Sequence, residues 1–181
     1  IHSNMNKGFT LIELFMGGAL ILLVTGALVV LSTLYFQNYS FSFEETLSIN
    51  YAQTALTSMV REIREARYGE DGAWPISLAN DNALTFYSDV TNDNRSDKVR
   101  YFLDGTDLKK GVTQASFNPI QYLSINEVTT VIASKVSTTS GSLFTYYNGD
   151  WPSDTVNNPL IPGSRLINTR FVRVHVLIDI D

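Results

Sequence analysis

The sequence contains no cysteine and only two histidines among its 181 residues. The missing cysteines exclude disulfide scaffolds, thiolate zinc sites, iron–sulfur ligation and cysteine nucleophiles. His2 and His175 lie near opposite ends of the chain, which argues against a multi-histidine metal site or a serine–histidine hydrolase. The sequence also lacks a glycine-rich phosphate loop and a recognisable pair of catalytic carboxylates. We therefore expect no enzymatic activity.

Charged residues are also scarce, at 17% of the chain against about 25% in an ordinary soluble domain. The 13 Lys and Arg residues are outnumbered by 18 Asp and Glu residues, which gives a formal net charge of −5. A nucleic-acid-binding surface needs a basic face. The charge balance therefore argues against nucleic acid as a partner.

Residues 14–43 contain no charged side chain. A helix needs about 20 apolar residues to cross a bilayer, so this run is long enough to cross it and continue further. Residues 19–24 and 27–31 are apolar on every side, and such a helix is buried in lipid or among other helices. The pattern predicts a membrane-spanning helix.

The segment before this run reads Lys7-Gly8-Phe9-Thr10-Leu11-Ile12-Glu13. A secretory signal peptide has a cleavage site of small residues at the end of its apolar region, and no such site follows the apolar run here. A lone carboxylate near hydrocarbon costs about 2.5–3.5 kcal/mol, so Glu13 should have a partner. Cleavage after Gly8 would give Phe9 a positively charged α-amino group, and Glu13 could pair with that amine on a neighbouring subunit. The alternative is an uncleaved anchor with an incidental glutamate.

This segment resembles the cleavage and methylation signal of type IV pilins and pseudopilins. The resemblance implies a leader at residues 1–8 that a prepilin peptidase removes between Gly8 and Phe9. It also implies N-methylation of Phe9 and a role for Glu13 in filament assembly. Residues 9–43 would then form a helix that spans the membrane first and packs in a filament core later.

Beyond the membrane segment, residues 44–68 are amphipathic and are expected to continue the same helix. Apolar residues recur at steps of three and four, which predicts a buried stripe that lies on a sheet: Ile49, Ala52, Leu56, Met59, Ile63 and Ala66. The same pattern places Glu62, Arg64 and Arg67 on the exposed side. We expect the helix to end at Tyr68, with Gly69 as a left-handed cap.

Residues 69–181 predict a globular head rich in β-structure. Strands are expected at 84–88, 98–103 and 108–112 as an antiparallel meander, at 143–147, and at 172–180. Residues 151–162 predict a surface loop. The last strand runs almost to Asp181, which is compatible with a native chain that continues further. Together with the long helix, these elements predict an α+β fold in which the helix packs on a mostly antiparallel sheet.

The layout of the head narrows the resemblance. An amphipathic helix that ends in residues 61–67, followed by strands at 84–88 and 98–103, is similar to J-type minor pseudopilins and W-type minor pilins. The resemblance implies a subunit that initiates or caps a type IV pilus or a type II secretion pseudopilus. The implied partners are a prepilin peptidase, other minor and major pilins, and the inner membrane. The chain would cross that membrane once, with its head outside the cytoplasm, before it reaches the filament tip.

An acidic loop places oxygen side chains at positions 1, 3, 5 and 9 of an EF-hand-like segment, namely Asp89, Thr91, Asp93 and Asp97. Alternate oxygen ligands of this kind can converge on calcium. Position 12 holds Arg100 instead of the bidentate glutamate, however. The alternative is a solvated hairpin loop, because Asn, Asp and Ser favour turns. No other cofactor is expected.

Aromatic residues of the head offer a second function class. Trp74, Trp151, Tyr146 and Tyr147 could form an adhesive patch or could instead cover the sheet with their rings. A structural assembly subunit is the first hypothesis. The alternative is a membrane-anchored binding module, such as an adhesin or a DNA-uptake tip subunit.

Overall fold

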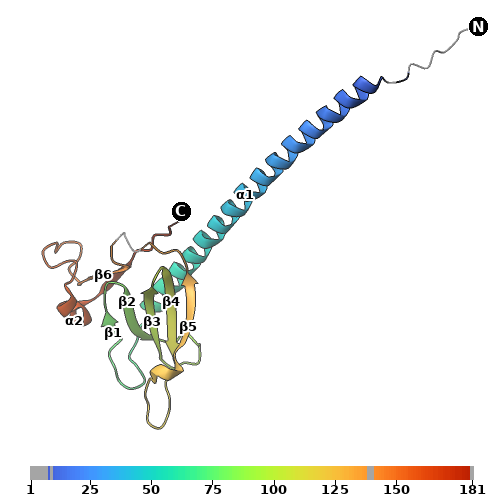
Figure 1. Ribbon diagram of the computed structural model, residues 1–181. Helices are drawn as coiled ribbons and strands as arrows, with labels where there is room; N and C mark the ends of the chain where they lie inside the picture. The colour runs from blue at the N-terminus through green and yellow to red at the C-terminus, as the bar shows by residue number, and fades with distance from the viewer. Residues whose placement is uncertain (1–7, 9, 138–140, 180–181) are drawn as a thin grey trace, which may run out of the picture. The chain divides into compact units, whose positions relative to one another are not determined.

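A computed structural model describes residues 8, 10–137 and 141–179, and for residues 38 and 40–48 it describes the backbone alone (Figure 1). The chain divides into two compact units, Ile1–Thr46 and Leu47–Asp181. Helix α1 extends over Leu11–Arg64 and contributes residues to both units. The structure confirms the predicted α+β fold.

The N-terminal unit is helical from Leu11 onward. Within the described residues, the stretch Leu11–Gln37 is the one helical segment long and apolar enough to cross a membrane. Its large apolar side chains are exposed in the chain, including Leu11, Leu22 and Phe15. A helix that is apolar all round has no face to turn toward water, so this unit needs lipid or other helices around it.

The C-terminal unit contains a five-stranded antiparallel sheet in the order β1-β2-β3-β4-β5. Its strands are Ile76–Ala79, Ala83–Ser88, Asp97–Asp104, Asp107–Thr113 and Val128–Ala133. The predicted three-stranded meander is therefore confirmed as β2, β3 and β4. Gly105 has φ +62° in the tight turn between β3 and β4, a conformation that glycine adopts without steric cost.

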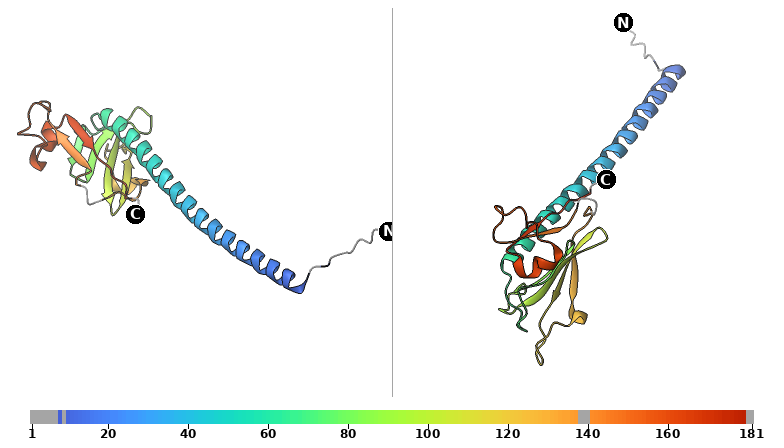
Figure 2. Two further views of the ribbon diagram at one scale, coloured as in Figure 1. Left: turned by 90° about the horizontal axis from the view of Figure 1, so that it is seen from above. Right: turned by 90° about the vertical axis from the view of Figure 1, so that its left-hand side faces the viewer.

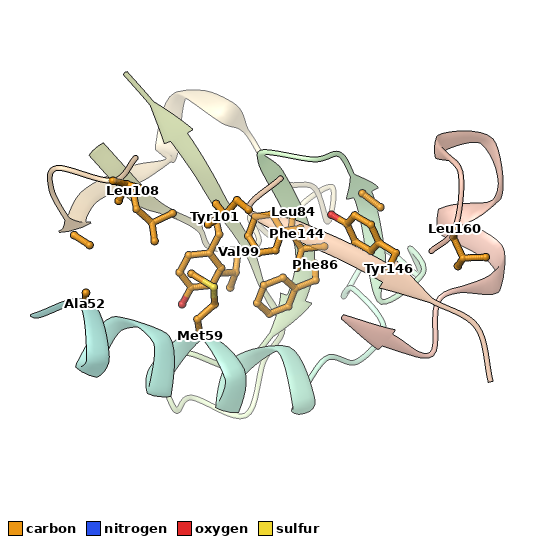
Figure 3. Packing of buried hydrophobic residues seen from close by; sticks show 14 residues of the cluster. Ala52, Met59, Leu84, Phe86, Val99, Tyr101, Leu108, Phe144, Tyr146 and Leu160 are labelled. Atoms are coloured by element: carbon orange, nitrogen blue, oxygen red, sulfur yellow. The ribbon is translucent and has the colours of Figure 1, made fainter. Parts of the chain in front are cut away.

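The C-terminal part of α1 packs on one face of this sheet. Met59, Phe86 and Val99 are fully buried and belong to one hydrophobic core (Figure 3). Alternate residues of a strand point to the same face, which is why Leu84 and Phe86 of β2 both reach the core. This packing determines which strand residues face α1 and which lie on the opposite face of the sheet.

The buried face of α1 differs from the predicted stripe at Ile49, Ala55 and Glu62. Ala52, Ala55, Met59 and Glu62 are buried, whereas Ile49 is exposed. Glu62 follows Met59 by three residues and so lies on the same side of the helix. The prediction that Glu62 lies on the exposed side was wrong, because partners on the sheet satisfy its carboxylate.

The helix ends earlier than predicted, at Arg64 instead of Tyr68. Gly69 does not adopt a left-handed conformation, so the predicted cap was also wrong. A Cβ atom at Gly69 would lie 2.6 Å from Asp71 Oδ1 and 3.1 Å from the Tyr87 ring. A larger residue at this position would therefore displace the Asp71 side chain and crowd the Tyr87 ring.

A second, two-stranded sheet joins β6, Phe144–Tyr147, to β7, Phe171–Val174. Its strands lie beside the larger sheet in both views of Figure 2. The Tyr146 hydroxyl donates a hydrogen bond to the Asn80 carbonyl at 2.7 Å, and the Phe144 N–H donates to the Asp81 carbonyl at 2.8 Å. These bonds attach the small sheet to the β1–β2 turn.

The predicted last strand, 172–180, is shorter in the structure. The ladder of β7 ends at Val174, and farther on Ile178 forms an isolated bridge with Val136. Beyond Val174, exposed residues continue to alternate with half-buried ones as far as Asp179. The period-two pattern therefore predicted the burial correctly, whereas the backbone hydrogen bonds go to other partners, such as from His175 N–H to the Leu143 carbonyl.

Three short helical segments complete the described chain. A 3₁₀ turn at Ser124–Asn126 precedes β5. A second turn at Pro162–Ser164 leads into α2, Arg165–Asn168. The predicted surface loop at 151–162 contains no helix or strand up to residue 161, but Pro162 begins the second 3₁₀ turn, and Asn158 and Leu160 are buried.

Candidate functional site

The start of α1 is the first candidate site. Gly8 and Glu13 lie within the described residues and are exposed, whereas Phe9, the predicted methylation position, lies outside them. Of the two residues that flank the predicted cleavage bond, the structure therefore describes Gly8 alone. A Cβ atom built on Gly8 would meet no atom of the other described residues within 4 Å.

Glu13 and Thr10 form a reciprocal cap at the first turn of the helix. The Thr10 N–H and the Thr10 hydroxyl both donate to Glu13 Oε2 at 2.9 Å. The Glu13 N–H donates to Thr10 Oγ1 at 3.4 Å. This arrangement is a capping box, in which two otherwise unpaired N–H groups at the helix start find acceptors.

The capping box supplies the partner that the sequence predicted for Glu13, but from within the same chain. The Thr10 N–H belongs to the peptide bond between Phe9 and Thr10, so cleavage between Gly8 and Phe9 would leave all the bonding atoms in place. Sequence reasoning missed this contact. The signal was present, because Thr-x-x-Glu directly before an apolar run is typical of a capping box.

A buried polar group joins α1 to the sheet in the C-terminal unit. The Tyr101 hydroxyl donates to Glu62 Oε2 at 2.6 Å, and the Lys110 ammonium donates to Glu62 Oε1 at 2.7 Å. The side chains of Glu62 and Lys110 are only 7% and 19% exposed. Burial, reinforced by the hydrogen bond to Glu62, raises the pKa of Tyr101 far above its usual range. This group anchors the helix to the sheet.

The acidic loop between β2 and β3 brings its predicted calcium ligands together, but they bind the loop backbone. Asp97 Oδ2 accepts from Val90 N–H, Thr91 N–H and the Thr91 hydroxyl at 2.9–3.1 Å. Asp89 accepts from the N–H groups of Asp93 and Asn94. The residue at the glycine position, Asn94, has φ +65°.

These bonds favour the hairpin-loop interpretation. Burial raises the pKa of Asp97 although its hydrogen bonds act in the opposite direction. Arg67 Nη2 lies 3.6 Å from Asp89 Oδ2 and occupies part of the space around this carboxylate. Nowhere in residues 8, 10–137 and 141–179 do three or more His, Cys, Asp or Glu side chains form a group that could hold a metal ion. The calcium prediction finds no support in this geometry.

The four aromatic residues of the predicted patch have different environments. Tyr146 and Tyr147 are buried in the C-terminal unit, as expected of rings that cover a sheet. Trp74 is 73% exposed and contacts Tyr68, while Trp151 is 40% exposed and stacks on Tyr147. An adhesive patch made of all four rings is therefore wrong, because two of them are core residues.

His175 is exposed, as predicted, and lies just beyond the end of β7. The described contacts give it a backbone role, since its N–H donates to the Leu143 carbonyl at 2.9 Å.

The comparisons with known proteins do not assign the chain to a family. No protein-family model and no curated protein matches the sequence.

Proposed function

We propose that this chain is a pilin-like structural subunit, of the minor pilin or pseudopilin type, that is processed by a prepilin peptidase and assembled into a filament. The observation that carries the proposal is the sequence Lys7-Gly8-Phe9-Thr10-Leu11-Ile12-Glu13 at the start of an apolar helix. The chain would first cross the inner membrane once, with its head outside the cytoplasm.

The helix supports this proposal through its surface. Large apolar side chains remain exposed along Leu11–Gln37, so the segment requires an apolar environment in every state of the protein. A bilayer supplies that environment before assembly, and the helices of other subunits supply it afterwards. The transfer from lipid to a helix bundle exchanges one apolar contact for another.

Glu13 supports the proposal through its position. The capping box keeps its carboxylate hydrogen-bonded at the first turn, where a cut after Gly8 would create an amine only four residues away. An amine of a neighbouring subunit could then pair with the same carboxylate and set the register between helices. The sheet-bearing head would contact other minor subunits.

The test is co-expression of the full chain with a prepilin peptidase, followed by intact-mass measurement and N-terminal peptide mapping. We expect a product that begins at a methylated Phe9. Gly8→Val is the matched control, because no atom of the other described residues lies within 4 Å of a Cβ at that position and the fold should not change. A chain that stays uncut beside a cleaved known substrate contradicts the proposal and favours a plain anchor with a ligand-binding head.

Incorporation into filaments is the second readout. Glu13→Ala should still be cleaved but should be lost from sheared filament fractions. Glu65→Ala, an exposed glutamate at the other end of the helix region, should be incorporated like the unmodified chain. Normal incorporation of Glu13→Ala would refute the register argument while leaving the processing result intact.

A further inference from the structure

A polar cavity of about 410 Å³ lies on the C-terminal unit and has no part in the proposed assembly mechanism. It opens on the sheet face opposite α1, because its strand residues alternate with Phe86, Val99 and Tyr101 of the core. Strands β1, β2, β3 and β4 contribute residues to its floor, and Tyr122, Ser124 and Glu127 line one wall. The polar residues that matter are Thr85, Lys98, Arg100, Thr113, Ser124 and Glu127.

Register across the sheet places these side chains side by side. Thr85 of β2 is the cross-strand partner of Arg100, and Lys98 is the partner of Thr113. Lys98 and Arg100 are two residues apart in β3 and therefore share this face. Two basic side chains and two threonine hydroxyls thus line one concave surface.

One of the two cations is already neutralised. Arg100 Nε and Nη2 donate to the two Glu127 oxygens at 2.8 and 2.7 Å in a bidentate pair. Gly111 makes this possible, since a Cβ atom there would collide with the Glu127 carboxylate. The Arg100 guanidinium also lies 3.8 Å from the centre of the Phe102 ring. The pair forms a rigid edge of the cavity with no net charge.

The remaining donors have no partner within the described residues. No hydrogen bond or ion pair reaches the Lys98 ammonium, the Thr85 hydroxyl or the Thr113 hydroxyl there. Thr85 and Thr113 are only 3% and 4% exposed as whole residues, and both line the cavity. Their hydroxyls are not among the buried unpaired polar atoms of the described residues, so they are open to the cavity and can donate to a group bound there.

We propose that this cavity binds a carboxylate, held by the Lys98 ammonium and by the hydroxyls of Thr85 and Thr113. All three of these side chains can donate hydrogen bonds to an anion. Among the described lining residues Glu127 is the only carboxylate, and it is already paired with Arg100. A single unpaired positive charge matches a monovalent carboxylate better than a doubly charged phosphate. The cavity volume leaves room for the group that carries the carboxylate.

The carboxylate can come from a free small acid or from the end of a peptide, and both present the same chemistry to Lys98. The test therefore titrates the full chain in detergent micelles with acetate, succinate, and a short N-acetylated peptide with a free or an amidated C-terminus. Sodium phosphate and sodium chloride at equal ionic strength are the competing anions. Backbone amide resonances of Lys98 and Thr113 report binding.

We expect saturable shifts with at least one carboxylate, weaker shifts with phosphate, and no saturation with chloride. Preference for the free peptide over its amide and over the small acids would identify a peptide end as the ligand. Lys98→Met should weaken binding at least tenfold, and Thr113→Val severalfold. Lys135→Met, at an exposed lysine outside the cavity, should bind like the unmodified chain.

Two results would overturn the proposal: no saturable shift with any carboxylate, or equal affinity in Lys98→Met and the unmodified chain. If Lys98→Met fails to fold, as judged by its spectrum without ligand, Thr113→Val and Thr85→Val decide the question. The inference does not depend on the proposed pilin-like function, because processing at Gly8 and binding at Lys98 are measured separately.

Discussion

The two parts of helix α1 have the same backbone and opposite surfaces. Leu11–Gln37, the apolar half, keeps its large apolar side chains exposed. Residues 47–64, the amphipathic half, bury Ala52, Met59 and Glu62 against strands of the same chain. The apolar half depends on its surroundings, whereas the amphipathic half carries its own packing partner.

We expect the buried polar contact of Glu62 to help fix the register of the helix on the sheet. An apolar stripe can slide by a turn at little cost, but a buried carboxylate must meet its donors. Glu62 meets Tyr101 and Lys110 in a single register. In the apolar half, the corresponding polar contact is the capping box of Thr10 and Glu13, which involves no other element.

The largest expected effect comes from paired phenylalanine substitutions in the two regions. Phe86→Ala should lower the free energy of unfolding of the C-terminal unit by about 4 kcal/mol, because Phe86 is fully buried against the core. Phe15→Ala should change it by less than about 0.5 kcal/mol, because Phe15 is exposed in the apolar half. Denaturant unfolding of the full chain in micelles, followed by near-ultraviolet circular dichroism, measures both. Equal effects would mean that the two regions do not differ in packing.

Removal of the buried carboxylate should have the next largest effect. Glu62→Ala leaves the Lys110 ammonium and the Tyr101 hydroxyl without their acceptor, so we expect a loss of about 3 kcal/mol in unfolding free energy. The same denaturant experiment measures it. Glu65→Ala is the control on the exposed side of the helix and should be close to neutral. A neutral Glu62→Ala would show that apolar packing alone holds the helix on the sheet.

A charge in the apolar half should disturb insertion instead of folding. Val24 lies at the middle of Leu11–Gln37, and Val24→Asp should make membrane insertion less favourable by about 3 kcal/mol. A glycosylation-reporter insertion assay gives this value. Thr57→Asp, on an exposed position of the amphipathic half, should leave insertion unchanged. Insertion that is indifferent to Val24→Asp would contradict a membrane-spanning role for this half.

The smallest effect concerns the loop that follows β6. Hydrogen bonds from Asn157 and its neighbours hold the pKa of Asp154 below its ordinary value of 3.8. Since the folded-state pKa is lowered, this carboxylate stabilises the loop above pH 3.8, and the contribution is lost as the pH falls through the lower folded value. Trp151 fluorescence should therefore change in acid. Asp154→Ala should remove that change, whereas Asp150→Ala should retain it.

Local pattern predicted most of the secondary structure. Strands at 84–88, 98–103 and 108–112 appear within one residue of their predicted ends, because period-two burial and the Asp104–Gly105 turn are both local signals. The extent of β7 could not be predicted in the same way. Its alternation continues past Val174, but a ladder also needs a partner strand, and the partner β6 ends first.

The polar contacts were harder to predict because they join residues far apart in the sequence. Glu62 has the helical spacing of a core residue but a charged side chain that is typical of a surface residue. It can be buried because Tyr101 and Lys110 donate hydrogen bonds to its carboxylate. Lys98 and Thr113 meet through strand register, which the sequence alone does not show. At the helix start the opposite holds, since the four-residue capping signal was visible in the sequence.

The apolar half also has a length that a bilayer does not match. Its 27 residues rise by about 1.5 Å each, so the apolar surface extends for about 40 Å against a hydrocarbon thickness of about 30 Å. An upright helix would leave roughly two turns of apolar side chains among lipid head groups or in water. Tilt, a locally thickened bilayer or a second helix alongside removes that mismatch. A helix of this length in a bilayer is therefore expected to tilt or to have a neighbouring helix beside it.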